Sequence, residues 1–136
     1  MVLVERFLRV LRGVEGDKIV GYALWSPAII ESGSMVSQGM GLGPVGVAPE
    51  LQRKGIGTLL IKEGNDTLRE RGCRFIIVLG HPDYYPRFGF VPASRYRIRS
   101  EWDMPDNAFM VLVLDKSQSS VIQGVAKYRP EFSVVS

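Results

Sequence analysis

This chain has few of the residues that form covalent cross-links or bind metal ions. Its 136 residues include one cysteine, Cys73, and one histidine, His81. A single cysteine excludes a disulfide within the chain and is typical of a reducing compartment. One thiol and one imidazole are too few for a Cys/His metal cluster, so no metal site is expected. The sequence therefore predicts a cytoplasmic domain that is stabilised by its core.

Long apolar runs and clusters of like charge are also missing. No apolar stretch approaches the ~20 residues of a membrane-spanning helix. Charged residues interrupt the segment from Met1 to Leu11, so neither a membrane partner nor a secretory signal is expected. The 17 Lys and Arg residues exceed the 14 Asp and Glu residues by a net charge of +3, and they are scattered along the chain. This scatter argues against nucleic acid as a partner.

The chain does have enough apolar material for one core. Hydrophobic residues make up 46% of the sequence. There is no internal repeat and no linker-like segment that would mark a boundary. We therefore expect a single domain over residues 1–136.

The first part of the chain predicts strands. Residues 7–14 and 19–25 are rich in β-forming residues and flank a turn at 15–18, which predicts a hairpin. The Ser- and Gly-rich segment 31–41 is expected to be a loop. It would lead into a further strand at 42–47.

The second part predicts one long helix among strands. Residues 55–71 have helical periodicity and end at a glycine. The expected buried stripe consists of Ile56, Leu59, Leu60, Gly64, Thr67 and Leu68. Strands are expected over 75–79, 109–114 and 121–125, with a short helix or turn over 83–88. Strands interrupted by helices predict a mixed α/β sheet.

The most informative segment runs from Leu42 to Leu60. A short apolar run ends at Val47, Pro49 interrupts it, and the basic loop 52–57 leads into the helix. A strand, a glycine-rich loop and a helix N-terminus bind phosphate groups, because free N–H groups and the positive end of the helix dipole meet there. The loop lacks the Lys of a P-loop and the third glycine of a dinucleotide fingerprint. Its pattern is Q-x-x-G-x-G.

This pattern after a strand resembles the acyl-CoA pyrophosphate loop of the GNAT superfamily of N-acetyltransferases. A second segment, Tyr84–Phe90, is similar to the superfamily's Y-x-[KR]-x-G-F element behind the fifth strand. The two motifs occur in the family's order, and the resemblance covers residues 18–114. Residues 124–132 also resemble the tail of a subgroup of predicted acetyltransferases. The implied fold is a GNAT-like acyl-CoA N-acyltransferase fold that lacks the usual first strand and two helices.

The resemblance also implies where acetyl-CoA would bind. The strands at 42–47 and 75–79 would separate, and the pantetheine arm would lie between them. The backbone of Val45, Gly46 and Val47 would bind the acetyl carbonyl and the pantetheine amides. The pyrophosphate would bind loop amides, with Gln52 at the first motif position. The loop residues concerned are Gln52, Arg53, Lys54, Gly55, Ile56, Gly57 and Thr58.

Tyr85 aligns with the tyrosine that serves the family as general acid. A phenol with a pKa of about 10 is protonated at neutral pH and can protonate a departing thiolate. A role in which Tyr85 only packs against the cosubstrate stays open. No general base is predicted. Glu50 and Glu31 lie outside the strand at 42–47, and His81 and Asp83 are assigned to a turn.

The predicted function is transfer of an acetyl group from acetyl-CoA to an amine whose identity the sequence does not show. In the family, the helices that are lacking here wall the acceptor site. Three alternatives therefore remain. A partner subunit, such as a second copy in a homodimer, supplies the wall; the acceptor site is open; or the chain is a catalytically silent acyl-CoA-binding or regulatory module.

Overall fold

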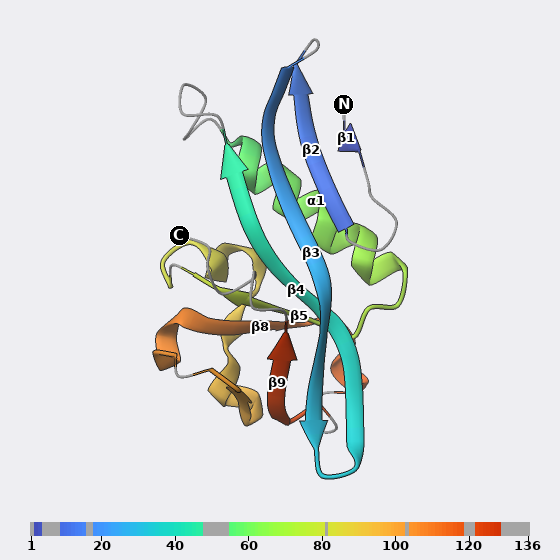
Figure 1. Cartoon of the computed structure of the whole chain (residues 1–136), viewed down its shortest axis with the longest axis vertical. Helices are drawn as coiled ribbons and strands as arrows, with labels where there is room; N and C mark the ends of the chain where they lie inside the picture. The colour runs from blue at the N-terminus through green and yellow to red at the C-terminus, as the bar shows by residue number, and fades with distance from the viewer. Residues whose placement is uncertain are drawn as a thin grey trace.

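The computed structural model describes residues 2–3, 9–15, 18–47, 55–80, 82–102, 104–118 and 122–128. In these segments a curved sheet carries the helix α1 (Ile56–Glu70) on one face (Figure 1). The strands are β1 (Val2–Leu3), β2 (Arg9–Glu15), β3 (Lys18–Ser32), β4 (Met35–Val47), β5 (Phe75–Leu79), β6 (Val91–Pro92), β7 (Ile98–Ser100), β8 (Phe109–Val113) and β9 (Gly124–Tyr128). Short 3-10 helices are η2 (Tyr85–Phe88), η3 (Ala93–Tyr96), η4 (Asp106–Ala108) and η5 (Lys116–Gln118).

The described strands form one mixed sheet in the order β1-β2-β3-β4-β5-β8-β6. β3 is long enough to have two neighbours on its outer edge: β2 pairs with its first half and β9 pairs with residues 28–31. β7 then adds to β9 in parallel, while β4 and β5 are also parallel. In Figure 1, β3 and β4 follow the long axis and β8 crosses them. The expected mixed α/β fold and the first hairpin are confirmed.

The sheet separates two hydrophobic clusters. Successive side chains of a strand point to opposite faces, and β5 shows this directly. Ile76 and Val78 pack toward α1, whereas Phe75 and Ile77 pack into the cluster on the other face. All four are fully buried. This explains why residues 75–79 form a continuous apolar run, as predicted for a strand that is covered on both faces.

The prediction of a loop at residues 31–41 is wrong. These residues lie mostly in β3 and β4, which join at a tight turn around Gly33. Ser37 is buried in β4, and Gly39 lies so close to β5 that a Cβ would fall 2.6 Å from the carbonyl oxygen of Phe75. The small residues that suggested a loop are there because two strands approach closely. Pairing with β3 along most of its length outweighs the weak strand propensity of β4.

The helix prediction is confirmed over Ile56–Glu70, but its buried stripe is partly wrong. Leu59 is 56% exposed, and the buried residues are Leu60, Ile61, Gly64, Asn65 and Leu68. Gly64 allows close contact with the ring of Trp25, where any Cβ would collide. Trp25 Nε1 donates a hydrogen bond to Asn65 Oδ1 at 3.2 Å. A buried asparagine was missed because its partner is distant in the sequence.

The other predicted elements are found with one shift, whereas β1, β6, β7, η3, η4 and η5 were not predicted. The turn expected over 83–88 is η2, which ends at Gly89 with φ 96°. The strand expected over 121–125 begins only at Gly124 and continues to Tyr128. Ile122 is buried in the core before the strand starts, which accounts for its apolar character. Within the described ranges, no helix has the length and hydropathy needed to span a membrane.

Candidate active site

β4 and β5 separate after a short stretch of pairing. Their ladder joins Met40–Leu42 to Ile76–Val78. Beyond it, β4 continues through Val45–Val47 with β3 as its partner, and β5 ends at Leu79 with β8 as its partner. Among the described residues, no strand fills the space between these two ends. The separation expected from the resemblance is therefore present, and within the described part of the chain one edge of Val45–Val47 has no strand partner.

A β-bulge lies where the strands separate. Gly43 and Pro44 of β4 together stand opposite one residue of β3, Leu24. Gly43 has φ 147°, a conformation that favours glycine. Pro44 has no N–H group to donate to a ladder. Because a bulge bends its strand and increases the twist, this dipeptide turns β4 away from β5.

The first turn of α1 begins without a side-chain cap. Gly55 is the N-cap residue with φ 85°, and a Cβ there would meet no atom within 4 Å. No acidic side chain lies in this turn. Its backbone N–H groups and the positive end of the dipole are thus suited to an anion. Ile56, Gly57 and Thr58 form the turn, whereas Gln52, Arg53 and Lys54 lie outside the described residues.

Tyr85 begins η2 and lies beside the end of β5. Its ring makes an edge-to-face contact with the ring of Phe90, with centroids 5.8 Å apart. It also packs so closely on Gly80 that a Cβ at Gly80 would collide with it. Burial raises the pKa of Tyr85 to about 12, and Tyr84 adds a smaller part. The phenol is therefore protonated at neutral pH and available as a proton donor.

Tyr84 joins η2 to the first turn of α1. Its hydroxyl shares a hydrogen bond of 2.9 Å with Thr58 Oγ1. Arg87 holds Tyr84 from the other side: Nε donates to the Tyr84 carbonyl at 2.9 Å, and the guanidinium carbon lies 4.4 Å from the ring centroid. Tyr84 had no predicted role, because its partner Thr58 is 26 residues away. Only its place next to Tyr85 could have suggested one.

A groove with a volume of about 410 Å³ lies between α1 and η2. It starts at Thr58 and is lined by the cations Lys62, Arg69 and Arg87. The one carboxylate on its wall, Asp66, pairs with Arg69 at 3.0 Å. The groove therefore carries a net positive charge and leads away from the uncapped helix end. An anionic ligand that begins at this helix end could continue along it.

Cys73 does not have the surroundings of a nucleophile. The side chain is half-buried, and its Sγ donates a hydrogen bond to the carbonyl of Phe75 at 3.2 Å. Burial raises the pKa of the thiol. A raised pKa lowers the population of the reactive thiolate at neutral pH. This environment suits a packing role for Cys73.

Two of the acidic residues considered as bases, Glu31 and Asp83, lie within the described residues. Glu31 lies near the end of β3 and forms an ion pair with Lys127 at 3.2 Å. Asp83 is exposed in the turn before η2. Glu50 and His81 lie outside the described residues. The described part of the chain thus adds no general base to the site.

The comparisons with known proteins assign the chain to a family. The family model described as acetyltransferase (GNAT) domain matches residues 6–92, more than half of the chain. This range includes the β4–β5 gap, the first turn of α1 and Tyr85, which together suit an acyltransferase. The chain belongs to the GNAT acetyltransferase family. The expected GNAT-like fold and the expected N-acetyltransferase activity are thereby confirmed at the level of the family.

Two proteins of Escherichia coli are similar to this chain in sequence. The N-acetyltransferase YhbS of Escherichia coli, itself uncharacterised, is 29% identical over 116 residues, covering 85% of this chain and 68% of YhbS. YjhQ of Escherichia coli, also an uncharacterised N-acetyltransferase, is 44% identical over 88 residues, covering 64% of this chain and 48% of YjhQ.

Two solved structures resemble the fold closely. The YhbS crystal structure in complex with CoA has a TM-score of 0.79 at 29% identity, over 93% of this chain and 68% of that one. A GNAT family acetyltransferase from Brucella melitensis in complex with acetyl-CoA has a TM-score of 0.68 at 32% identity, over 91% and 68% of the chains.

Proposed function

We propose that this chain binds acetyl-CoA along the β4–β5 gap and across the first turn of α1. The backbone of Val45, Gly46 and Val47 would bind the acetyl carbonyl and the pantetheine amides, because this edge of β4 pairs with no described strand. The pyrophosphate would bind amides of the loop and the first helical turn. Those residues are Arg53, Lys54, Gly55, Ile56, Gly57 and Thr58, preceded by Gln52.

One observation carries the proposal: a strand edge without a partner leads to an uncapped helix end at which glycines leave room. Gly55 places no side chain in the open space before the helix. The groove beyond it is positively charged, as the phosphate-rich end of CoA would require. The complexes of two relatives with CoA and acetyl-CoA support the same ligand.

Tyr85 would act as the general acid. An alkylamine has a pKa of about 10 and reaches the enzyme as an ammonium ion, so it has to lose a proton before attack. Its nitrogen then forms the C–N bond as the C–S bond breaks. The Tyr85 hydroxyl gives its proton to the departing thiolate sulfur and regains one from the amine nitrogen. The products are an amide and a free thiol, and one proton passes to the solvent.

The enzyme is favoured over a catalytically silent acyl-CoA-binding module. Tyr85 is present, held against Gly80, and protonated at neutral pH. The family match also runs through it. The homodimer, the cytoplasmic location, the single domain over residues 1–136 and the lack of the first strand and two helices stay predictions.

The test of the cosubstrate site is a calorimetric titration with acetyl-CoA of the wild type and of Gly55→Glu. The substitution places a negative charge at the proposed pyrophosphate position and should abolish saturable binding. Gly72→Glu is the matched control. Gly72 follows the other end of α1, has φ 80°, and like Gly55 has no atom within 4 Å of a Cβ. Loss of binding in both variants, or no binding by the wild type, would refute the proposed site.

A further inference from the structure

A second pocket lies on the face of the sheet opposite α1. It has a volume of about 280 Å³ and is formed by β7, the segment that follows it, η4 and the start of β8. Ile98, Met104 and Phe109 belong to or pack against the hydrophobic cluster on this face. The side chains of α1, Tyr84 and Tyr85 pack in the cluster on the other face. The pocket is therefore separate from the groove proposed for the cosubstrate.

The pocket lies next to the end of β5, on the face of the sheet opposite α1. Phe109, which lines it, is the strand partner of Leu79, the last residue of β5. The N–H of Gly80 donates to the carbonyl of Ala108 at 3.0 Å. The ring of Tyr85 packs on the same Gly80. Gly80 thus contacts both the proposed acid, Tyr85, and Ala108, which directly precedes the start of β8 at the pocket.

The amine acceptor has to approach the thioester from the face of the sheet opposite α1. If acetyl-CoA lies on the α1 side of the gap, its bulk blocks approach to the thioester from that side. Among the described residues no strand lies between these ends of β4 and β5, so the opposite face is the side left for a nucleophile. On that face, this pocket lies beside β5, one strand away from the gap.

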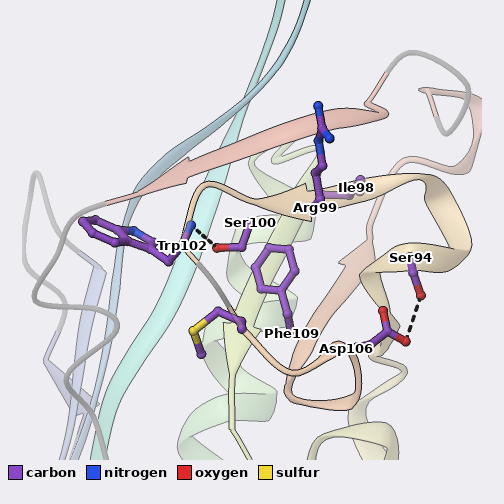
Figure 2. Close-up of a pocket in the computed structure, with 8 residues that line it drawn as sticks. Ser94, Ile98, Arg99, Ser100, Trp102, Asp106 and Phe109 are labelled. Atoms are coloured by element: carbon purple, nitrogen blue, oxygen red, sulfur yellow. Dashed lines mark hydrogen bonds between the residues drawn. The ribbon is translucent and has the colours of Figure 1, made fainter.

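The residues that line the pocket are apolar in the middle and on one side, and include a carboxylate on the other side. Figure 2 shows Phe109 in the middle, with Trp102 on one side and Asp106 and Ser94 on the other. Trp102 is 42% exposed. It follows Glu101, whose N–H donates a hydrogen bond to the carbonyl of Ala126 in β9. The Asp106 end lies near β6, the outer strand. In the order of the strands the gap therefore lies on the Trp102 side of Phe109.

The Asp106 end is suited to a cation. Its carboxylate accepts one long hydrogen bond, of 3.3 Å, from Ser94 Oγ. A carboxylate has about four acceptor sites, so it has capacity for an ammonium group. Arg99 is at the rim, but Figure 2 shows its guanidinium extending away from Phe109. The apolar surfaces of Trp102 and Phe109 lie between this carboxylate and the gap.

We infer that this pocket binds the acceptor, and that the acceptor is a compact amine with an apolar body and a second positive charge at its far end. The inference rests on the proposed function. The nitrogen that attacks has to be neutral, whereas a carboxylate favours a charged partner. The charge held at Asp106, away from the gap, therefore belongs to a nitrogen that does not react. The body of the acceptor would lie along Phe109 and Trp102 and present its free amine to the gap.

Three probes with six-carbon chains test the charge preference: 1,6-diaminohexane, 1,6-hexanediol and adipate. Binding is measured without acetyl-CoA by tryptophan fluorescence. The chain has two tryptophans. Trp25 is fully buried and Trp102 is exposed, so a change in emission reports on Trp102. The diamine should bind roughly tenfold more tightly than 1,6-hexanediol, as a charge-assisted bond predicts, and adipate should bind most weakly.

Substitutions test whether Asp106 causes the preference for the diamine and whether Trp102 gives the fluorescence signal. Asp106→Asn should remove the preference for the diamine, while Asp115→Asn, just after the other end of β8, should keep it. Trp102→Phe should remove the signal. Equal binding of the three probes, tighter binding of adipate, or an unchanged preference in Asp106→Asn would overturn the inference. Acetyl-CoA calorimetry on the same samples shows separately whether the proposed function holds.

Discussion

Thr58 Oγ1 and the Tyr84 hydroxyl lie 2.9 Å apart and join the first turn of α1 to the segment that begins with Tyr85. The first turn is the proposed pyrophosphate site, and Tyr85 is the proposed acid. One hydrogen bond thus connects the two ends of the reaction site. Arg87 reinforces it by holding both the ring and the carbonyl of Tyr84.

Tyr84→Phe is expected to weaken acetyl-CoA binding while leaving the acid in place. The lost hydrogen bond contributes about 1 kcal/mol, so KM for acetyl-CoA should rise roughly fivefold, with a smaller change in kcat. Thr58→Val should have the same effect, and Thr58→Ser, which keeps the hydroxyl, should not. The double variant Tyr84→Phe/Thr58→Val should be no worse than either single variant. Additive losses would show that the two hydroxyls act independently.

Tyr85→Phe is expected to lower kcat by about 10²–10⁴-fold, the usual contribution of a general acid. The ring and its packing on Gly80 and Phe90 remain, so acetyl-CoA affinity should stay within a few-fold of the wild type. Thiol release gives kcat and calorimetry gives affinity. Tyr96→Phe, in η3, is the control. Unchanged turnover in Tyr85→Phe would leave Tyr85 with a packing role only.

The raised pKa of Tyr85 predicts how stability depends on pH. In the folded state the pKa is about 12, above the ordinary value of 10.0. The protonated phenol therefore stabilises the fold fully below pH 10, and this contribution is lost as the pH rises toward 12. Urea unfolding at pH 9 and pH 11.5 should show a larger loss in the wild type than in Tyr85→Phe. An equal loss in both would mean that burial does not raise this pKa.

Gly64→Ala is expected to destabilise the fold although alanine favours helices. The added Cβ would collide with the ring of Trp25, which is fully buried. Overpacking of this kind costs about 1–3 kcal/mol, more than the ~1 kcal/mol gained in helix propensity. Urea unfolding measures the difference, with Glu63→Ala on the exposed face of α1 as the control. A more stable Gly64→Ala would show that α1 can shift on the sheet.

Local chemistry was enough to predict the separate parts of the site. The glycines of the loop predicted an open helix N-terminus, and Gly55 has the conformation that only glycine adopts readily. The separation of the strands at 42–47 and 75–79 was implied by the resemblance, and a bulge at Gly43 and Pro44 is found there. Prediction was poor wherever a residue's role depends on a distant partner. Gly39 and Ser37 looked like loop residues because Phe75, which passes close to Gly39, is far away in the sequence.

By itself, the sequence determined the family, the strand–loop–helix order and the tyrosine behind β5, because these depend on residue types at short spacing. Only the tertiary structure decided which residues meet: Tyr84 with Thr58, Trp25 with Gly64 and Asn65, and Gly80 between Tyr85 and the strand end that lines the pocket. The physical reason is that curling of the sheet brings segments together over 20 or more residues. Side-chain periodicity carries no record of such contacts.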